Sequence, residues 1–315
     1  MSVKGGFQLS QSTMPLSRSS VESTSDNEKA LDRLGFNIAA DATNNWSAIQ
    51  LDRKTTLNKI CLKYNLTRST NIFRNVGKQL YVEHNHKIIY CEVPKAGCSN
   101  WKRILILLHM NLSREPDEID HEAVHLKSPV KTLISYPQHQ WMKYLNTYTK
   151  VMFTRDPLER LVSAYRNKFL HSYMNPYYSG YVADKIRKQF RISRTPKTNI
   201  TFLEFVRFVL QENPAESDLH WREMNKLCDP CNIQYDIIGK LTTLHEDASH
   251  VLKIIKAPKN LYFSSAQQYP GEALTDEKIT KDYLKNLSHE YIQELIKQYK
   301  LDFCLFNYSF NISSF

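Results

Sequence analysis

The sequence predicts an α/β fold with a mainly parallel sheet flanked by helices. Three short apolar segments are typical of strands, at residues 87–93, 150–154 and 233–238, and a segment with helical periodicity follows each of them. Strands that alternate with helices form parallel sheets that are covered on both faces. The 315 residues, of which 42% are hydrophobic, are sufficient for one large domain with a buried core.

The first 45 residues differ in composition from the rest of the chain. Residues 1–45 are rich in Ser and Thr and lack apolar periodicity, so we predict a flexible polar tail or stem. A helix is expected over 46–64, and the apolar pattern then continues without an internal repeat, which predicts a single domain over residues 46–315. The expected surface loops are residues 172–180, 191–199 and 263–275.

The first strand–loop–helix unit has a lysine in its loop. Strand 87–93 is followed by Pro-Lys-Ala-Gly-Cys-Ser-Asn at 94–100 and by a helix over 101–110, which Ser99 or Asn100 is placed to cap. Such a loop presents free backbone N–H groups and a positive dipole end to an anion, and Lys95 adds a charge. The Walker A order, with Lys after the second Gly, is absent, so a P-loop NTPase or kinase is disfavoured. We therefore predict a phosphate or sulfate cradle.

The second unit has an arginine at the end of its strand. Arg155 follows strand 150–154, and a helix to about residue 170 begins with Asp156 as N-cap and Glu159 as its capping-box partner. Arginine binds phosphate through two N–H groups, although Arg155 could instead pair with a carboxylate. Ser163 is on the polar face of this helix, where its hydroxyl can reach a ligand. Two anion sites at strand ends of one sheet suggest a nucleotide with phosphates at both ends.

Four more helices are expected towards the C-terminus. The pairs Thr201 with Glu204 and Thr243 with Glu246 have capping-box spacing and predict helices that end near residues 211 and 255. Segments 276–287 and 288–303 have amphipathic helical patterns.

The net charge of +10 predicts an acidic partner. The basic clusters are either a solvated surface or a track for a polyanionic glycan. They comprise Lys102, Arg103, Arg160, Arg166, Lys168 and the segment 185–194. A nucleic-acid binder would combine the 185–194 run with Tyr177, Tyr178 and Tyr181, but the sequence contains no recognisable nucleic-acid module. No apolar segment of this sequence is long enough to span a membrane.

The cysteines and glycosylation sequons favour the lumen of the secretory pathway. Cys228 and Cys231 could form half a zinc site, a redox pair or parts of disulfides, and we favour a structural disulfide that includes at least one of them. The six cysteines are accompanied by seven Asn-X-Ser/Thr sequons, each a potential acceptor for N-glycosylation. These are at Asn45, Asn65, Asn111, Asn199, Asn286, Asn307 and Asn311.

Two segments resemble motifs of the Golgi carbohydrate sulfotransferases. Residues 93–103 (Val-Pro-Lys-Ala-Gly-Cys-Ser-Asn-Trp-Lys-Arg) are similar to the family's 5′-phosphosulfate loop, and residues 153–164 (Phe-Thr-Arg-Asp-Pro-Leu-Glu-Arg-Leu-Val-Ser-Ala) are similar to its 3′-phosphate motif. The most similar group sulfates the 4-hydroxyl of N-acetylgalactosamine in chondroitin, dermatan or terminal glycans. The resemblance extends over roughly residues 80–310.

The resemblance implies a nucleotide-binding, P-loop-like sulfotransferase fold and an enzyme that uses 3′-phosphoadenylyl sulfate as co-substrate and requires no metal. Lys95 would be catalytic, because its charge can neutralise the bridging oxygen between phosphate and sulfur. The residues implied to bind the donor are Lys95, Ala96, Gly97, Cys98, Ser99, Asn100, Arg155 and Ser163.

An attacking sugar hydroxyl needs a base, and His125 is the candidate. His125 ends an Ala-Val-His segment that matches the family, with His121 and then Glu122 in reserve; the alternative is a structural histidine. His220 either belongs to the acceptor site or forms a buried structural pair with Trp221.

The implied partner is a glycan acceptor, either a chondroitin or dermatan chain or a glycoprotein that carries N-acetylgalactosamine, and no nucleic acid. The implied location is the lumenal side of the Golgi membrane, through a type II anchor that this sequence does not contain. Cys304 replaces an apolar residue of the family, so we do not expect all six cysteines to pair. A glycan-binding protein without catalysis is the alternative function, and the presence of Lys95, Arg155 and Ser163 argues against it.

Overall fold

The computed structural model describes residues 45–67, 76–171, 176–191, 199–213, 216–264 and 273–309. The tail expected over residues 1–45 lies outside this part of the chain, except for Asn45, where helix α2 (Asn45–Lys63) begins. Helix α2 confirms the helix expected at 46–64.

A four-stranded sheet in the order β1-β2-β3-β4 forms the centre of the fold. Strands β2 (Ile88–Cys91), β3 (Thr149–Thr154) and β4 (Ile237–Lys240) are parallel, which confirms the mainly parallel sheet. Strand β1 (Leu80–Glu83), which the sequence analysis did not predict, pairs antiparallel with β2 at one edge. The tight turn between them is held by the Glu83 carboxylate, which accepts hydrogen bonds from the backbone N–H groups of Asn85 and His86 at 2.7 and 2.8 Å.

The third predicted strand is shifted along the sequence. The apolar run 233–238 was expected to be extended, but Pro230 begins a helical turn, α11 (Pro230–Ile233), and Gln234 ends it with a φ of 56°. Strand β4 therefore starts only at Ile237. Proline is well tolerated at the first helical position, and the following positive φ stops the turn, so these local signals outweigh the β-type run.

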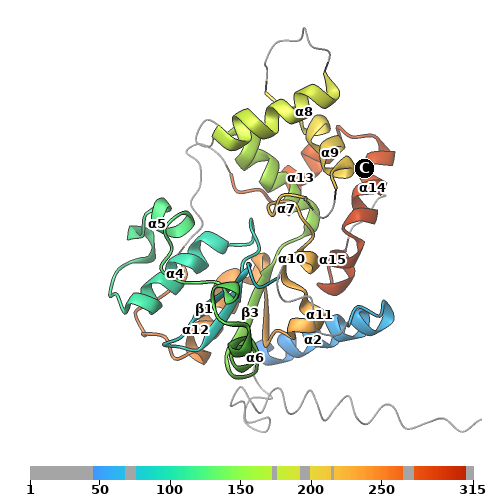
Figure 1. The fold of residues 1–315 in the computed structure, drawn as a ribbon. Helices are drawn as coiled ribbons and strands as arrows, with labels where there is room; N and C mark the ends of the chain where they lie inside the picture. The colour runs from blue at the N-terminus through green and yellow to red at the C-terminus, as the bar shows by residue number, and fades with distance from the viewer. Residues whose placement is uncertain are drawn as a thin grey trace, which may run out of the picture. The chain divides into compact units, whose positions relative to one another are not determined.

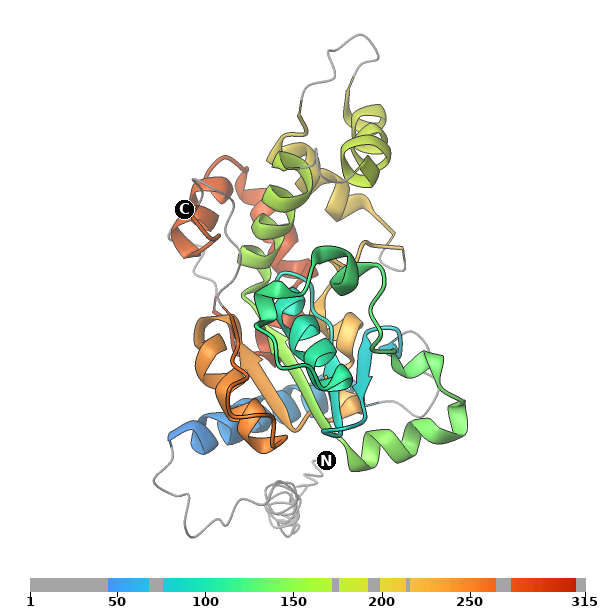
Figure 2. The same cartoon turned by 90° about the vertical axis from the view of Figure 1, so that its left-hand side faces the viewer.

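Helices cover the sheet and its exposed edge (Figures 1 and 2). Helices α4 (Cys98–Met110) and α12 (Leu244–Ile254) lie on one face, and α10 (Met224–Cys228) and α11 lie on the other. Helix α2 covers the edge of β4, where Gln50 accepts from the Ile238 N–H at 3.0 Å and Arg53 donates to the Ile238 carbonyl at 2.8 Å. These side chains satisfy backbone groups that an edge strand would otherwise leave open.

A second core lies beyond the ends of the strands, around α7 (Pro157–Tyr165), as the upper part of Figure 1 shows. It is rich in aromatic side chains, including Tyr165, Phe169, Phe205 and Trp221. The elements around it are η3 (Arg166–Leu170), η5 (Tyr177–Val182), α8 (Ala183–Phe190), α9 (Phe202–Gln211), α13 (Glu277–Leu284), α14 (His289–Gln298) and α15 (Lys300–Leu305). The remaining elements are η1 (Pro116–Glu118), α5 (His121–His125), η2 (Leu133–Ser135), α6 (Gln138–Thr147) and η6 (Leu241–Thr243).

Three local expectations have different outcomes. The Thr201–Glu204 capping box is present at the start of α9. The Thr243–Glu246 box is wrong, because the Thr243 hydroxyl donates to Asp247 at 2.6 Å instead. The loop expected at 172–180 is wrong over 177–180, which belongs to the π-helical turn η5, while 172–175, 192–198 and 265–272 lie outside the described residues.

Two disulfides tie the layers together. Cys61 of α2 pairs with Cys231, and Cys91 of β2 pairs with Cys228, across 170 and 137 residues of sequence. The structural disulfide favoured from the sequence is confirmed, and the half zinc site and the redox pair are wrong, because the two cysteines have different partners. Cys98 and Cys304 are free, as the expected incomplete pairing requires. Among the described helices, none is both long and apolar enough to cross a bilayer.

Candidate active site

The loops after β2 and β3 meet at the carboxyl end of the parallel strands. These strands are parallel neighbours, with Cys91 opposite Met152, so their carboxyl ends lie side by side. Arg155 joins the two loops, because its Nη1 donates to the carbonyl oxygen of Lys95 at 3.1 Å. The structure thus brings together the two predicted anion-binding segments.

The loop after β2 is a tight turn with an open helix start. Lys95 and Gly97 have φ values of 70° and 83°, in the left-handed region. Gly97 is the N-cap residue of α4, and no side chain of the described chain caps this helix. The expected caps, Ser99 and Asn100, are wrong: both lie inside the first turn, because α4 begins three residues earlier than predicted. The first-turn N–H groups of α4 are therefore left for another acceptor.

The side chains of this loop have separate roles. Asn100 is buried, donates to the Ser264 carbonyl at 3.1 Å and accepts from Arg103 at 2.8 Å, so its side chain supports the fold. Ala96 and Cys98 are also buried, and the backbone N–H of Ala96 donates to the Val93 carbonyl at 3.2 Å. The Ser99 hydroxyl is 3.1 Å from Nε2 of His125.

The loop after β3 closes its helix with a side chain. The Asp156 carboxylate accepts from the backbone N–H groups of Leu158 and Glu159 at 2.9 and 3.0 Å, which confirms the predicted N-cap. The capping box predicted for Glu159 does not form. The Glu159 carboxylate instead lies 3.5 Å from Nε of Arg155. Arg155 is buried and also donates to the Thr275 carbonyl, and Ser163 is half-buried on α7.

Lys95 lies in a cluster of cations. Burial, together with the positive charges of Arg155, Lys168 and Arg160 and against an opposing effect of Cys98, lowers the pKa of Lys95 to about 7. At neutral pH this lysine is thus only partly protonated in the ligand-free protein. An anion between these groups would restore the full charge of Lys95, so the cluster has the chemistry of a site for a phosphate or sulfate.

Arg160 is a buried structural residue that the sequence analysis assigned to the basic surface. Its guanidinium donates to the carbonyl oxygens of Pro94, Leu219 and Arg222 at 2.9, 2.8 and 2.7 Å. Lys102 and Arg103 are also buried, and Lys102 pairs with Glu92 at 2.6 Å. The solvated-surface interpretation is wrong for these three residues. The sequence did contain a signal for the burial of Arg160, because this residue, five positions after Arg155, falls on the buried side of α7.

Of the three candidate histidines, His125 and His220 have side chains that the structure describes. His125 is exposed at the end of α5 and reaches the loop through Ser99, while the side chains of His121 and Glu122 are outside the description. His220 hydrogen-bonds to Asp218 at 2.7 Å and to Tyr178 at 3.0 Å. Trp221 is buried and donates to Glu212 at 2.8 Å, so His220 and Trp221 have different hydrogen-bond partners.

The chain is similar to sulfotransferases. A family model described as the sulfotransferase family matches residues 78–309. Carbohydrate sulfotransferase 9 from Homo sapiens is 40% identical over 82% of this chain and 60% of its own length. Carbohydrate sulfotransferase 8 from Mus musculus is 38% identical over 82% of this chain and 64% of its own, and carbohydrate sulfotransferase 11 from Rattus norvegicus is 36% identical over 74% and 67%. The chain thus spans about three fifths of the first of these relatives. No solved structure matches it.

Proposed function

Because this chain belongs to the sulfotransferase family, among its carbohydrate sulfotransferases, we propose that it transfers a sulfuryl group from 3′-phosphoadenylyl sulfate to a sugar hydroxyl. The hydroxyl is the 4-hydroxyl of N-acetylgalactosamine in a chondroitin or dermatan chain or in a glycoprotein glycan. The resemblance of residues 93–103 and 153–164 to the motifs of that group supports this choice of acceptor.

The observation that carries the proposal is the junction of the two loops. One buried guanidinium, that of Arg155, contacts the backbone of Lys95, and the neighbouring helix α4 begins without a side-chain cap. The lowered pKa of Lys95, caused by burial and then by nearby cations, indicates a site that lacks compensating negative charge. A co-substrate with phosphates at both ends would supply that charge to both loops, so the residues present fit it.

Each loop then has its own task. The N–H groups at the start of α4 and the Ser99 hydroxyl bind the 5′-phosphate, and Lys95 stabilises the charge that develops on the bridging oxygen. Arg155 and Ser163 bind the 3′-phosphate. The chemistry supplied by the bound co-substrate is an activated sulfuryl group; the protein contributes position and charge.

His125 takes the proton from the attacking hydroxyl. Its exposed imidazole lies against Ser99, beside the loop that holds the sulfuryl end of the donor. As the new O–S bond forms, the bond between sulfur and the bridging oxygen of the donor would break, 3′-phosphoadenosine 5′-phosphate would leave, and the proton of the acceptor hydroxyl would move to this imidazole.

The disulfides and sequons support an oxidising lumen as the place of action, which we propose is the Golgi with membrane association. Cys61–Cys231 and Cys91–Cys228 join segments that are distant in sequence, which is typical of structural disulfides of the secretory pathway.

An acceptor panel with radiolabelled donor tests the function. We expect label in unsulfated chondroitin or dermatan, or in a glycan with terminal N-acetylgalactosamine, and 4-sulfated disaccharides after digestion. The variant expected to lose activity is Lys95→Ala. Its matched control is Lys297→Ala, which replaces an exposed lysine on α14. Binding of glycan without any transfer would contradict the proposal and favour a lectin-like protein.

A further inference from the structure

The loop after β2 is attached to the His220 segment by Arg160. The same guanidinium donates to the carbonyl of Pro94, just before Lys95, and to the carbonyl of Leu219, just before His220. Arg160 is almost fully buried, at 1% exposure, so these contacts are part of the packed fold. His220 is consequently a neighbour of Lys95, and the positive charge of Lys95 helps to lower the pKa of His220.

Asp218 and Tyr178 fix the orientation and tautomer of His220. The Asp218 carboxylate lies 2.7 Å from Nδ1 of His220 and also accepts the backbone N–H of His220 at 2.8 Å and the Tyr178 hydroxyl at 2.9 Å. A carboxylate can only accept, so Nδ1 carries the proton and Nε2 keeps its lone pair. Among the described residues, no hydrogen bond to Nε2 occurs, so Nε2 can accept one from a ligand.

The charge state of His220 suits a hydrogen bond to a ligand better than proton transfer. Burial lowers the pKa of His220 to about 4, assisted by the charges of Lys168 and Lys95 and opposed by Asp218. The imidazole is therefore neutral at physiological pH. A base with so low a pKa is a weak proton acceptor, because general bases work best with a pKa near the operating pH. Its Nε2 nevertheless remains a good hydrogen-bond acceptor for a hydroxyl group.

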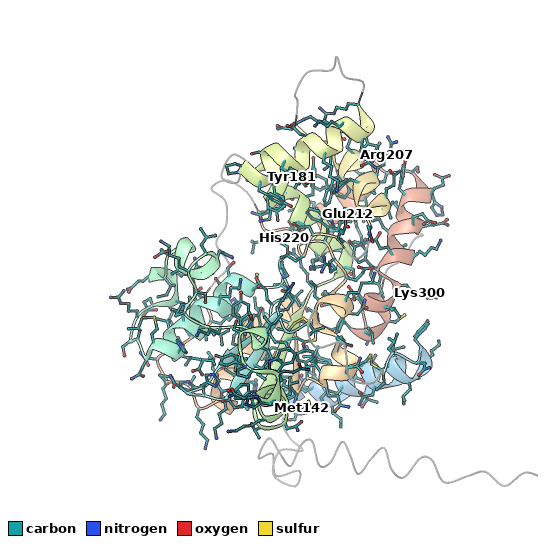
Figure 3. The ribbon with its side chains drawn as sticks, in the orientation of Figure 1. Met142, Tyr181, Arg207, Glu212, His220 and Lys300 are labelled. Carbon is teal, nitrogen blue, oxygen red and sulfur yellow. A yellow bond between two sulfur atoms is a disulfide. The ribbon has the colours of Figure 1, made fainter. Side chains whose placement is uncertain are left out.

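An exposed aromatic pair lies next to His220. Tyr177 and Tyr181 are 52% and 67% exposed, and their rings stack with centroids 5.6 Å apart. Tyr178 links them to the histidine, because its ring packs against Tyr177 at 5.0 Å and against His220 at 5.7 Å. Figure 3 shows Tyr181 and His220 in the helical part of the molecule, beyond the sheet. Aromatic faces beside hydrogen-bonding groups suit a pyranose ring, which has C–H groups on its faces and hydroxyls on its rim.

We propose that His220, Tyr177 and Tyr181 form a subsite for a pyranose ring of the acceptor glycan. Nε2 of His220 accepts a hydrogen bond from a hydroxyl of the bound sugar, and the tyrosine pair packs against the ring. Asp218 and Tyr178 are positioning residues that hold the imidazole. The subsite deepens the proposed function and rests on it, since it delivers the sugar to the loop that contains Lys95.

The test measures donor binding, acceptor KM and kcat separately. Tyr181→Ala and His220→Ala are compared with the wild type, with Tyr262→Ala as the control because Tyr262 is a half-exposed tyrosine outside the cluster. Donor binding is measured by calorimetry with 3′-phosphoadenosine 5′-phosphate. The acceptor probe is an unsulfated chondroitin hexasaccharide. We expect each cluster variant to raise the acceptor KM by about three- to tenfold, the value of one lost contact, with donor affinity unchanged.

Conservative variants and stability keep the result interpretable. His220→Gln retains an acceptor oxygen and should restore part of the acceptor affinity, as Tyr181→Phe should restore packing; thermal melting confirms that the variants are folded. Wild-type acceptor KM in both alanine variants, with donor binding intact, would overturn the subsite. A fall in kcat of a hundredfold or more at unchanged KM in His220→Ala would overturn it as well and make His220 the base. A wild-type protein that binds no donor would instead contradict the proposed function.

Discussion

The two strand–loop–helix units share one architecture but treat the helix N-terminus differently. In the unit after β2, Gly97 begins α4 with a left-handed φ of 83°, and no described side chain caps the helix. In the unit after β3, the Asp156 carboxylate occupies the same position on α7. The first unit can therefore bind an anion with its backbone, whereas the second must use side chains such as Arg155. The comparison of the two units indicates that the backbone N–H groups at a helix start can bind a ligand only where no side chain caps them.

The largest expected effect concerns His125, which contacts Ser99 of the first loop. If His125 is the base, His125→Ala lowers the transfer rate by about 10²- to 10⁴-fold, because an unassisted hydroxyl is a poor nucleophile. Donor affinity should stay at the wild-type value, and single-turnover assays with calorimetry measure both. Normal donor binding together with a wild-type rate would place the base elsewhere and leave His125 as a neighbour of Ser99.

The next effect separates binding from catalysis in the first loop. Lys95→Ala should lower kcat by about 10²- to 10³-fold, the range for removal of one group that stabilises transition-state charge. Donor affinity should fall much less, because the backbone of the loop remains. Steady-state kinetics beside calorimetry distinguish the two quantities, with Lys297→Ala as the control. A loss of donor affinity of this size at unchanged kcat would show that Lys95 only binds the donor.

Donor binding should take up a proton above pH 7. Burial, followed by the charges of Arg155, Lys168 and Arg160, lowers the pKa of Lys95 to about 7, so the ligand-free lysine loses its proton as the pH rises. A bound phosphate favours the protonated form and raises this pKa. Donor affinity should therefore fall between pH 7 and pH 9, by up to about tenfold per pH unit, and be less affected in Lys95→Ala.

Calorimetry in two buffers with different ionisation enthalpies measures the proton uptake directly. The wild type should take up a larger fraction of a proton at pH 8 than Lys95→Ala does. Equal uptake by the two proteins would show that another group titrates.

The smallest effect belongs to the cap of the second loop. Asp156→Ala removes hydrogen bonds to the N–H groups of Leu158 and Glu159 and should lower the free energy of unfolding by about 1 kcal/mol. Asp156→Asn retains a good N-cap and should lose less. Donor affinity should change little in either variant, since the carboxylate serves the helix. A strong gain in affinity for the donor in Asp156→Ala would mean that the helix start, once open, becomes a second backbone cradle.

Local signals in the sequence were sufficient for the strands and helices of the two units, but not for the start of the first helix or for the surroundings of the units. The apolar runs before Pro94 and Arg155, and the Asp156 cap, are encoded within a few residues, and the structure has them. The contacts of Arg160 with Leu219 and Arg222 span about sixty residues, so no local pattern reveals them. The same holds for the partners of the disulfides.

The errors also have local physical causes. Strand β4 starts late because Pro230 favours a helical turn, and the caps expected at Ser99 and Asn100 fail because Gly97 allows the helix to begin earlier. The Asp218–His220–Tyr178 cluster combines segments forty residues apart, and the sequence alone left His220 between two roles.

The central claim is that both loops bind one nucleotide, with the 5′-phosphate at the first and the 3′-phosphate at the second. Calorimetry of Arg155→Ala with two ligands tests it: 3′-phosphoadenosine 5′-phosphate, and adenosine 5′-phosphate, which lacks the 3′-phosphate. We predict that Arg155→Ala weakens binding of the first ligand by about ten- to a hundredfold, the value of a charge-assisted contact, and leaves binding of the second nearly unchanged. An equal loss for both ligands, or none for either, would contradict the account.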